Sequence, residues 1–233
     1  MTELIVALDV ATLKEEQELV ERLHGTVTFF KVGLQLFTGH GHRAVDVVLK
    51  RGGRVFLDLK LHDIPQTVAL ALKETQKLGV EAVSVHLSGG AAMLREARAL
   101  AARPKLWGVS MLTSLSDSDA AVFHEGAKVK DVVARLAKLG KQEGIDALIC
   151  SPQEVAALRP LVGKLPFVTP GIRPAGADLN DQKRVMTPAE AAALGIEHIV
   201  VGRPITHAED PLRAAQDILT SMRTTRPSSV EKA

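Results

Sequence analysis

The sequence predicts an α/β protein folded as a single (β/α)8 TIM barrel. Eight short and almost continuously apolar runs alternate with stretches of helical periodicity along the 233 residues. Such runs are typical of parallel strands that are covered on both faces, and the intervening helices would supply that cover. No linker rich in Pro, Gly or Ser divides the chain. We therefore expect one barrel domain over residues 1–223 and a disordered polar tail over residues 224–233.

The eight apolar runs are the expected strands, and they span 4–10, 28–34, 54–61, 82–88, 105–112, 147–151, 167–172 and 198–203. An open, doubly wound sheet is the alternative arrangement for so many alternating elements. It is disfavoured because no G-x-G-x-x-G fingerprint follows the first run.

Helix signals follow the runs. Thr12 and Glu15 have the spacing of a capping box, and Pro65 suits the first turn of the helix after the third run. Apolar residues recur at helical spacing after most of the other runs. After the second run we expect a helix that carries Val45, Val48 and Leu49, and after the fourth a helix that reaches Arg103. After the fifth run we expect a polar loop and then a helix over 129–139. After the sixth, seventh and eighth runs we expect helices that end near Leu161, begin near Pro188 and cover 212–222, respectively.

Composition excludes several classes of protein. Apolar residues make up 46% and charged residues 24%, which is ordinary for a globular protein, and the net charge is only +2. This balance gives no reason to expect nucleic acid or a membrane surface as a partner, and the absence of Tyr argues against base-stacking platforms. The single cysteine, Cys150, rules out an intrachain disulfide and is expected to be a buried, inert thiol. The first apolar run is too short for a signal peptide or a membrane span, so a cytoplasmic location is expected.

Polar residues interrupt or end the apolar runs where catalytic groups of a (β/α)8 barrel lie, at the carboxyl ends of the strands. They are Asp9, Lys31, Asp58, Lys60, His86, Thr113, Ser114, Ser151, Arg173 and Arg203. A solvated turn is a sufficient explanation for Ser151. It does not explain charges inside apolar runs, which would be buried without a partner unless they meet one another.

Asp58 and Lys60 are two residues apart on one expected strand, so their side chains should point to the same side. Asp9 and Lys31, on the two preceding strands, can join them in a network of alternating charges. A purely structural ion-pair cluster is the alternative. It is the weaker interpretation, because such clusters are costly and this end of the barrel is where ligands bind.

The segment DLKLHDIPQT, residues 58–67, resembles the D-x-K-x-x-D-I-x-x-T motif of orotidine 5′-monophosphate decarboxylases. The resemblance extends over the whole barrel. It includes ALDV (7–10), FFKVG (29–33), VHLSGG (85–90), MLTS (111–114), VTPGIRP (168–174), DQKRVMTP (181–188) and VGRPIT (201–206). One departure is Leu87, where a small residue is expected; it should perturb packing near His86 without affecting a catalytic role.

The resemblance implies removal of CO₂ from C6 of orotidine 5′-monophosphate, which yields uridine 5′-monophosphate for de novo pyrimidine synthesis. This reaction leaves electron density on a vinylic carbon, and a fixed cation with a transferable proton is needed beside it. Lys60 meets both needs as electrostatic stabiliser and general acid. Asp58 and Asp63 would keep that lysine protonated and oriented. No cofactor is expected.

The resemblance also assigns substrate contacts around the pyrimidine and ribose. Asp9 and Lys31 would hold ribose hydroxyls, and either Thr113 or Ser114 would contact the pyrimidine ring. Asp63 and Thr67, with Ile64 beside them in the motif, would serve the active site of a neighbouring subunit. The protein is therefore expected to be a homodimer with active sites shared across the interface.

The phosphate end can be interpreted from the residues themselves as well. In VGRPIT, Gly202 would allow close approach of an anion to the backbone, and Arg203 supplies a fork of donors. Loops after the seventh and eighth strands are the usual phosphate site of this fold. By resemblance, Pro170, Arg173 and Gln182 belong to a loop that closes over phosphate and base.

A bound metal is not expected, because GHGH (39–42) lacks a partner carboxylate and Lys60 already supplies a cation among the aspartates. Besides the decarboxylase, two alternatives remain open from the sequence. The enzymatic alternative is a barrel relative that acts on a sugar phosphate through a metal-stabilised enediolate. The non-enzymatic alternative is a silent nucleotide-binding protein, which would not require a lysine between carboxylates.

Overall fold

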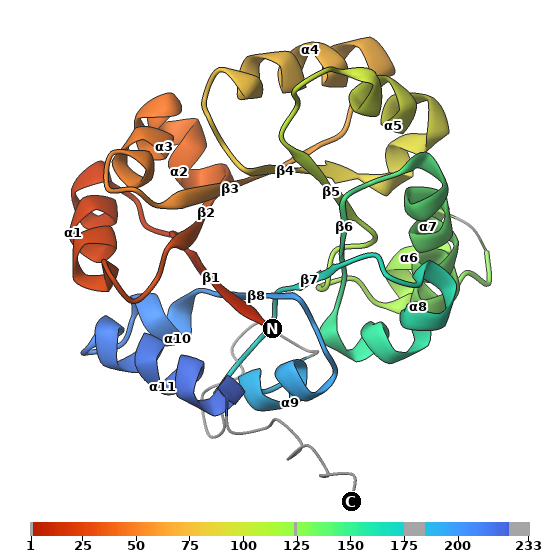
Figure 1. Ribbon diagram of the computed structural model, residues 1–233. Helices are drawn as coiled ribbons and strands as arrows, with labels where there is room; N and C mark the ends of the chain where they lie inside the picture. The colour runs from red at the N-terminus through yellow and green to blue at the C-terminus, as the bar shows by residue number, and fades with distance from the viewer. Residues whose placement is uncertain (1, 124, 175–184, 224–233) are drawn as a thin grey trace, which may run out of the picture.

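The computed structural model describes residues 2–123, 125–174 and 185–223, and these form a closed barrel of parallel strands. Each strand pairs with the next, and β8 pairs with β1, which closes the ring. Figure 1 looks along the barrel, with the strands forming an inner ring and the helices lying outside it. The predicted (β/α)8 barrel is therefore confirmed. The tail over residues 224–233 lies outside the described residues.

The inner ring consists of β1 (Glu3–Ala7), β2 (Phe29–Gly33), β3 (Arg54–Leu61), β4 (Ala82–His86), β5 (Lys105–Val109), β6 (Ala147–Ile149), β7 (Phe167–Thr169) and β8 (His198–Val201). The outer layer consists of α1 (Leu13–Leu23), α2 (Leu34–His40), α3 (His42–Leu49), α4 (Pro65–Gln76), α5 (Gly90–Ala99), α6 (Asp117–Phe123), α7 (Val129–Glu143), α8 (Val155–Val162), α9 (Pro188–Ala193), α10 (Arg203–Thr206) and α11 (Pro211–Arg223). Two 3₁₀ turns, η1 (Leu87–Gly89) and η2 (Pro152–Glu154), precede α5 and α8.

Several local predictions are confirmed. Thr12 and Glu15 form the capping box of α1, in which each side chain bonds the backbone N–H of the other residue. Pro65 begins α4. Proline lacks an N–H, and at the first position of a helix this costs no hydrogen bond, because the first N–H groups have no partner within the helix. The third strand has the expected bounds, Arg54–Leu61.

The helix predicted to carry Val45, Val48 and Leu49 is confirmed as α3, but α2 precedes it, and two other predictions were wrong in detail. The segment after β2 holds two helices, because Gly41 adopts a φ of 59° and breaks the helix between α2 and α3. The polar loop after β5 contains the short helix α6, whose start is stabilised by a 2.8 Å bond from the Ser116 N–H to Asp119 Oδ2. Helix α5 ends at Ala99 rather than Arg103, because the backbone is already extended at Leu100.

Apolar residues fill the barrel interior from the amino ends of the strands upward. The cluster comprises Ile5, Ala7, Phe29, Phe56, Ala82, Trp107, Val109, Ala147, Ile149, Val168 and Val200. Trp107 is 1% exposed within this cluster, and its ring centroid lies 5.8 Å from that of Phe29 and 4.4 Å from that of Phe56. A filled interior of this kind leaves no passage through the barrel.

The amino end of the barrel is also covered by ion pairs. Arg54 pairs with Glu3 of β1 and with Glu81, which precedes β4, and its guanidinium lies 4.4 Å from the centroid of the Phe29 ring. Lys105 of β5 pairs with the same Glu81 at 2.9 Å. Charged side chains therefore cover the barrel interior at this end of the ring.

The unexpected Leu87 occupies a space that glycines provide. Its side chain is fully buried, and its Cδ2 would lie 2.5 Å from a Cβ at Gly108 and 3.0 Å from a Cβ at Gly140. Gly108 belongs to β5 and Gly140 to α7. The larger residue is thus accommodated between strand and helix.

Glu16 is a buried carboxyl that no ligand site explains. It lies on the inner face of α1, is 0% exposed, and neither carboxyl oxygen has a hydrogen-bond partner among the described residues. Burial raises the pKa of Glu16 to about 8, although the nearby Arg51 opposes the rise. The side chain is therefore protonated in the folded protein at neutral pH.

This carboxyl should make the free energy of unfolding fall as the pH rises from about 4.5 to about 8. The folded protein keeps the proton over that range whereas the unfolded chain releases it, so folding becomes progressively less favourable. Glu16→Gln should therefore raise Tm more at pH 9 than at pH 5, as measured by circular dichroism. Glu18→Gln, on the exposed face of the same helix, is the control. An equal gain for Glu16→Gln at both pH values would contradict the account.

Candidate active site

Polar side chains replace the apolar ones at the open end of the barrel. Each of these polar residues lies two positions after a residue of the apolar interior. Because side chains alternate along a strand, residues two apart point to the same side, here the inside of the barrel. In this way Asp9 follows Ala7, Lys31 follows Phe29, Asp58 follows Phe56, and Ser84 follows Ala82. The chain thus builds a polar layer directly on top of its hydrophobic interior.

Four charged groups in this layer form a connected network. Lys31 Nζ donates a 2.9 Å hydrogen bond to Asp9 Oδ1 and lies 3.8 Å from Asp58 Oδ2. Lys60 Nζ donates to the same Asp58 oxygen at 2.8 Å. The structure therefore brings together the four residues from which the sequence predicted an alternating network.

Asp58 is the most enclosed of the four, with only 8% of the residue exposed. Burial alone would raise the pKa of its carboxyl. The ammonium groups of Lys31 and Lys60, with hydrogen bonds from Lys60 and Ser84, outweigh burial and hold the pKa of Asp58 below its ordinary value. A buried negative charge is thus fixed beside two lysines at neutral pH.

An irregularity in β3 places Lys60 against Asp58. Leu57 pairs with Val83 and Leu61 with Val85, so three residues of β3 stand opposite the single residue Ser84 of β4. Within this bulge the Lys60 backbone has a φ of 51°, a left-handed conformation that residues other than glycine rarely adopt. Strained backbone of this kind often marks functional sites.

Gly33 leaves the space that the Lys31 ammonium occupies. It stands opposite Asp58 in the pairing of β2 with β3. A Cβ at this position would lie 2.8 Å from Lys31 Nζ and 3.2 Å from Asp9 Oδ1. The charge network therefore needs a residue without a side chain at position 33, although the backbone angles of Gly33 are ones that any residue can adopt.

A cavity of about 400 Å³ adjoins this network at the ends of β7, β8 and β1. It is lined by Ala7, Asp9, Lys31, Pro170, Gly171, Arg173, Val200, Gly202, Arg203 and His207. Six of these residues were predicted from the sequence to bind substrate: Asp9, Lys31, Pro170, Arg173, Gly202 and Arg203. The two arginines give this side of the mouth a positive charge.

Arg173 is 7% exposed, and its Nε has no hydrogen-bond partner among the described residues. Burial, together with repulsion from Arg203, lowers the pKa of Arg173 from its ordinary value. Two neighbouring guanidinium groups at a cavity wall, one with an unused buried donor, are suited to bind an anion such as a phosphate.

Other predicted site residues do not line this cavity. Asp63 is exposed and accepts a 2.6 Å bond from the Ile64 N–H, while Ile64 itself is 65% exposed and Thr67 is also exposed. Thr113 and Ser114 lie in the loop after β5. Gln182 falls outside the described residues.

Two residues of the site were not predicted. His207 lines the cavity one helical turn beyond Arg203, and a spacing of four residues on a helix was the signal that could have identified it. Ser84 bonds both Asp58 and Lys60, and its only signal was a polar side chain two residues before His86 in an apolar strand. His86 was noted as a strand-end residue; burial and the neighbouring His62 and Lys60 lower its pKa.

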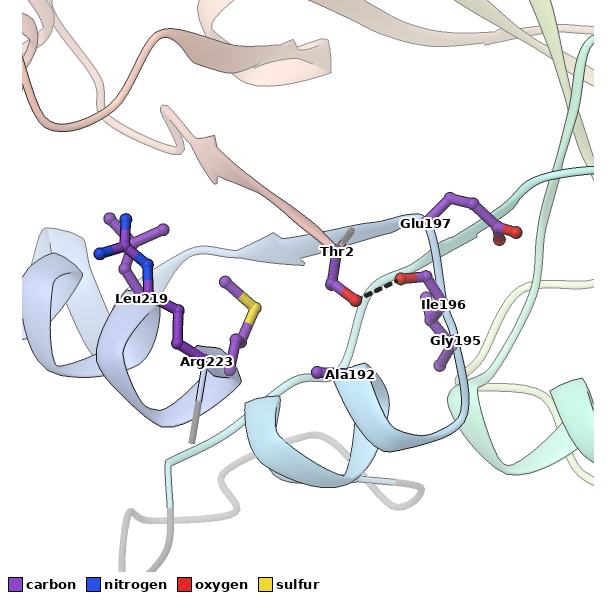
Figure 2. A pocket seen from close by; sticks show the side chains of 8 residues that line it. Thr2, Ala192, Gly195, Ile196, Glu197, Leu219 and Arg223 are labelled. Atoms are coloured by element: carbon purple, nitrogen blue, oxygen red, sulfur yellow. Dashed lines mark hydrogen bonds between the residues drawn. The ribbon is translucent and has the colours of Figure 1, made fainter. Parts of the chain in front are cut away.

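A larger cavity lies at the opposite end of the barrel. Its volume is about 620 Å³, and it is lined by Thr2, Ala192, Gly195, Ile196, Glu197, Leu219, Met222 and Arg223. Figure 2 shows Thr2 bonding the Ile196 carbonyl, while Glu197 and Arg223 lie on opposite sides of the hollow. Among the described residues that line it, no pair of charged groups converges, and catalytic residues of this fold come from the other end of the strands.

No group of three or more His, Cys, Asp or Glu side chains among the described residues is close enough to hold a metal ion. No helix within those same residues is long and apolar enough to cross a membrane.

Fold and site together define a barrel enzyme with a lysine–aspartate network beside an arginine-lined cavity. Residues 2–218 match the family model described as the orotidine 5′-phosphate decarboxylase / HUMPS family, and the chain belongs to this family. The resemblance stated from the sequence motifs is thereby confirmed.

Individual relatives agree over nearly the full chain. An orotidine 5′-phosphate decarboxylase of Moorella thermoacetica is 47% identical, covering 92% of this chain and 90% of the relative. One from Syntrophotalea carbinolica is 46% identical, covering 94% of each. A crystal structure of the Lactobacillus acidophilus enzyme of the same name superposes with a TM-score of 0.81 at 37% identity, covering 94% of this chain and 98% of that one. These likenesses confirm the prediction that the chain is an enzyme of this type.

Proposed function

We propose that this protein decarboxylates orotidine 5′-monophosphate to uridine 5′-monophosphate in pyrimidine synthesis without a cofactor, with Lys60 as the essential cation. The observation that carries the proposal is the Lys60 ammonium, held 2.8 Å from the buried Asp58 carboxylate at the open mouth of the barrel. A cytoplasmic location, in keeping with the single buried cysteine, is part of the same proposal.

The reaction needs stabilisation of charge at one carbon atom. When the bond from C6 to the carboxylate breaks, CO₂ leaves and the electron pair remains on C6. The Lys60 ammonium stabilises this pair and then transfers one Nζ proton to C6, and the neutral amine regains a proton from water. Asp58 fixes the ammonium before substrate arrives, so little reorganisation is needed during the reaction.

The remote phosphate would supply binding energy for this step. Arg203 and Arg173 line the cavity next to Asp9 and Lys31, which suits a phosphate on one side and ribose hydroxyls on the other. The Nε of Arg173, which has no partner within the described part of the chain, is a buried donor suited to an anion. Binding at a distance from C6 can hold the nucleotide in the reactive orientation.

The site is proposed to be completed by a second copy of the chain. Asp63 and Thr67 are exposed on this subunit, and exposed apolar side chains lie near them, namely Ile64 at 65% and Leu70 at 57%. Exposed apolar groups on one face favour association. In a homodimer Asp63 and Thr67 would reach the partner's active site.

The alternative is metal-assisted chemistry on a sugar phosphate. The geometry favours the nucleotide reaction, because a lysine ammonium stands where such chemistry would need a metal ion among carboxylates. Full activity with a chelator present is the expected result for our proposal. Loss of activity that is restored by a divalent metal would favour the alternative.

Lys60→Ala should lower kcat by at least about a thousand-fold, because it removes both the cation and the proton donor. The measurement is the loss of the ultraviolet absorbance of orotidine 5′-monophosphate in the presence of EDTA. Binding of uridine 5′-monophosphate should persist, since the arginines remain. Lys138→Ala, an exposed lysine of α7, is the control and should keep wild-type activity. Ordinary turnover by folded Lys60→Ala would refute the assignment.

Mixing Lys60→Ala with Asp63→Ala should restore activity if Asp63 serves the partner's site. Random exchange makes about half of the dimers hybrids, and each hybrid has one site with both native residues. About a quarter of wild-type activity is therefore expected, measured with the same absorbance assay. Native mass spectrometry would establish that hybrids formed. Hybrids without any recovered activity would show that Asp63 acts within its own subunit.

A further inference from the structure

Ser84 occupies a special place beside the lysine–aspartate network. It lies in β4, is 0% exposed, and is the single residue that stands opposite the three-residue bulge of β3. The residues on either side of it in β4, Val83 and Val85, are buried and apolar. A hydroxyl in these surroundings must find its partners within the protein.

Its hydroxyl bonds both functional residues of β3. Ser84 Oγ donates to Asp58 Oδ1 at 2.8 Å and accepts the backbone N–H of Lys60 at 2.8 Å. The second oxygen of Asp58 receives the Lys60 ammonium at 2.8 Å. The Ser84 hydroxyl therefore connects the Asp58 carboxylate to the Lys60 backbone. Because the same carboxylate also bonds the Lys60 ammonium, the three residues form a closed ring of hydrogen bonds.

The bond to the Lys60 backbone matters because this residue has a φ of 51°. Such a conformation is unfavourable for a lysine and persists only where the surroundings hold it. The bulge also removes the regular partner that a strand N–H would have in β4. Ser84 replaces that partner and so supports the strained backbone from which the Lys60 side chain extends.

We propose that Ser84 is a positioning residue that holds the Asp58 carboxylate and the Lys60 backbone in the geometry required for decarboxylation. The inference rests on the proposed role of Lys60. Ser84 itself is assigned no contact with substrate; it acts through Asp58 and Lys60. The substitution Ser84→Ala removes the hydroxyl that bonds the Lys60 N–H and Asp58 Oδ1, so the Lys60 ammonium should lose its fixed position.

The same bond affects the ionisation of Asp58. The charged groups that face this carboxylate are Lys31 from β2, Lys60 from its own strand and, when protonated, His86 from β4. The hydrogen bond from Ser84 favours the ionised form, so its loss raises the pKa of Asp58. The acid limb of the profile of kcat/KM against pH should then move to higher pH.

The test compares Ser84→Ala with Ser84→Thr, which keeps the hydroxyl. Ser84→Ala should lower kcat about ten- to a hundred-fold while KM changes little, because the phosphate and ribose contacts are elsewhere. Its acid limb should shift upward, and Ser84→Thr should recover most of kcat and the wild-type limb. Circular dichroism establishes the folded fraction to which kcat is normalised.

Ser110→Ala is the matched control. Ser110 is a buried serine at the end of β5, only 2% exposed, and its hydroxyl bonds the Ile149 carbonyl at 3.1 Å instead of Asp58 or Lys60. This variant should lose stability yet keep the wild-type pH profile and kcat. If Ser84→Ala does not fold, Ser84→Cys replaces it, because a thiol is only a weak donor. The same loss of kcat and the same upward shift of the acid limb are then expected of Ser84→Cys.

Two outcomes would overturn the inference. One is a folded Ser84→Ala protein with wild-type kcat and an unmoved acid limb. The other is a loss of kcat no greater than in Ser110→Ala. The Lys60→Ala experiment keeps the failures apart: if Lys60→Ala is inactive while Ser84→Ala is normal, only the inference about Ser84 fails.

Discussion

The Asp58 carboxylate is a buried negative charge, and much of the open end of the barrel is arranged to stabilise it. Lys60 bonds one of its oxygens and Ser84 the other, while Lys31 lies 3.8 Å away and is itself bonded to Asp9. An unpaired charge in this position would be very costly, so each partner is needed. The bulge of β3 and the strained Lys60 backbone follow from bringing the ammonium onto this carboxylate.

The barrel separates stability from chemistry along its axis. At the amino end, Trp107 and its aromatic neighbours fill the interior, and ion pairs around Arg54 cover it. At the carboxyl end, polar or charged side chains lie two residues further along several strands, and two of them, Asp9 and Lys31, line an open cavity. The position of Lys60 is thus set by strands whose amino-terminal halves are packed in the apolar interior. Such support is what a site needs to hold groups in place before substrate binds.

Much of this arrangement could be predicted from the sequence, because alternation and strand ends locate side chains without knowledge of tertiary contacts. The bounds of β3 and the meeting of Asp9, Lys31, Asp58 and Lys60 were predicted in this way. The bulge was not predicted, since the register of two strands depends on their pairing. Ser84 was missed for the same reason, because its importance comes from standing opposite that bulge. The proposed role of Asp63 in a neighbouring subunit rests on resemblance, since a single chain does not contain its own partner.

A crystal structure with bound uridine 5′-monophosphate would test the central claim most directly. The account predicts that Lys60 Nζ remains bonded to Asp58 and lies within about 3.5 Å of C6, the distance of a near-attack geometry. The phosphate should contact Arg203 and Arg173 at the carboxyl end of the barrel. A nucleotide whose C6 lies far from Lys60, or one bound in the cavity lined by Thr2 and Arg223, would contradict it.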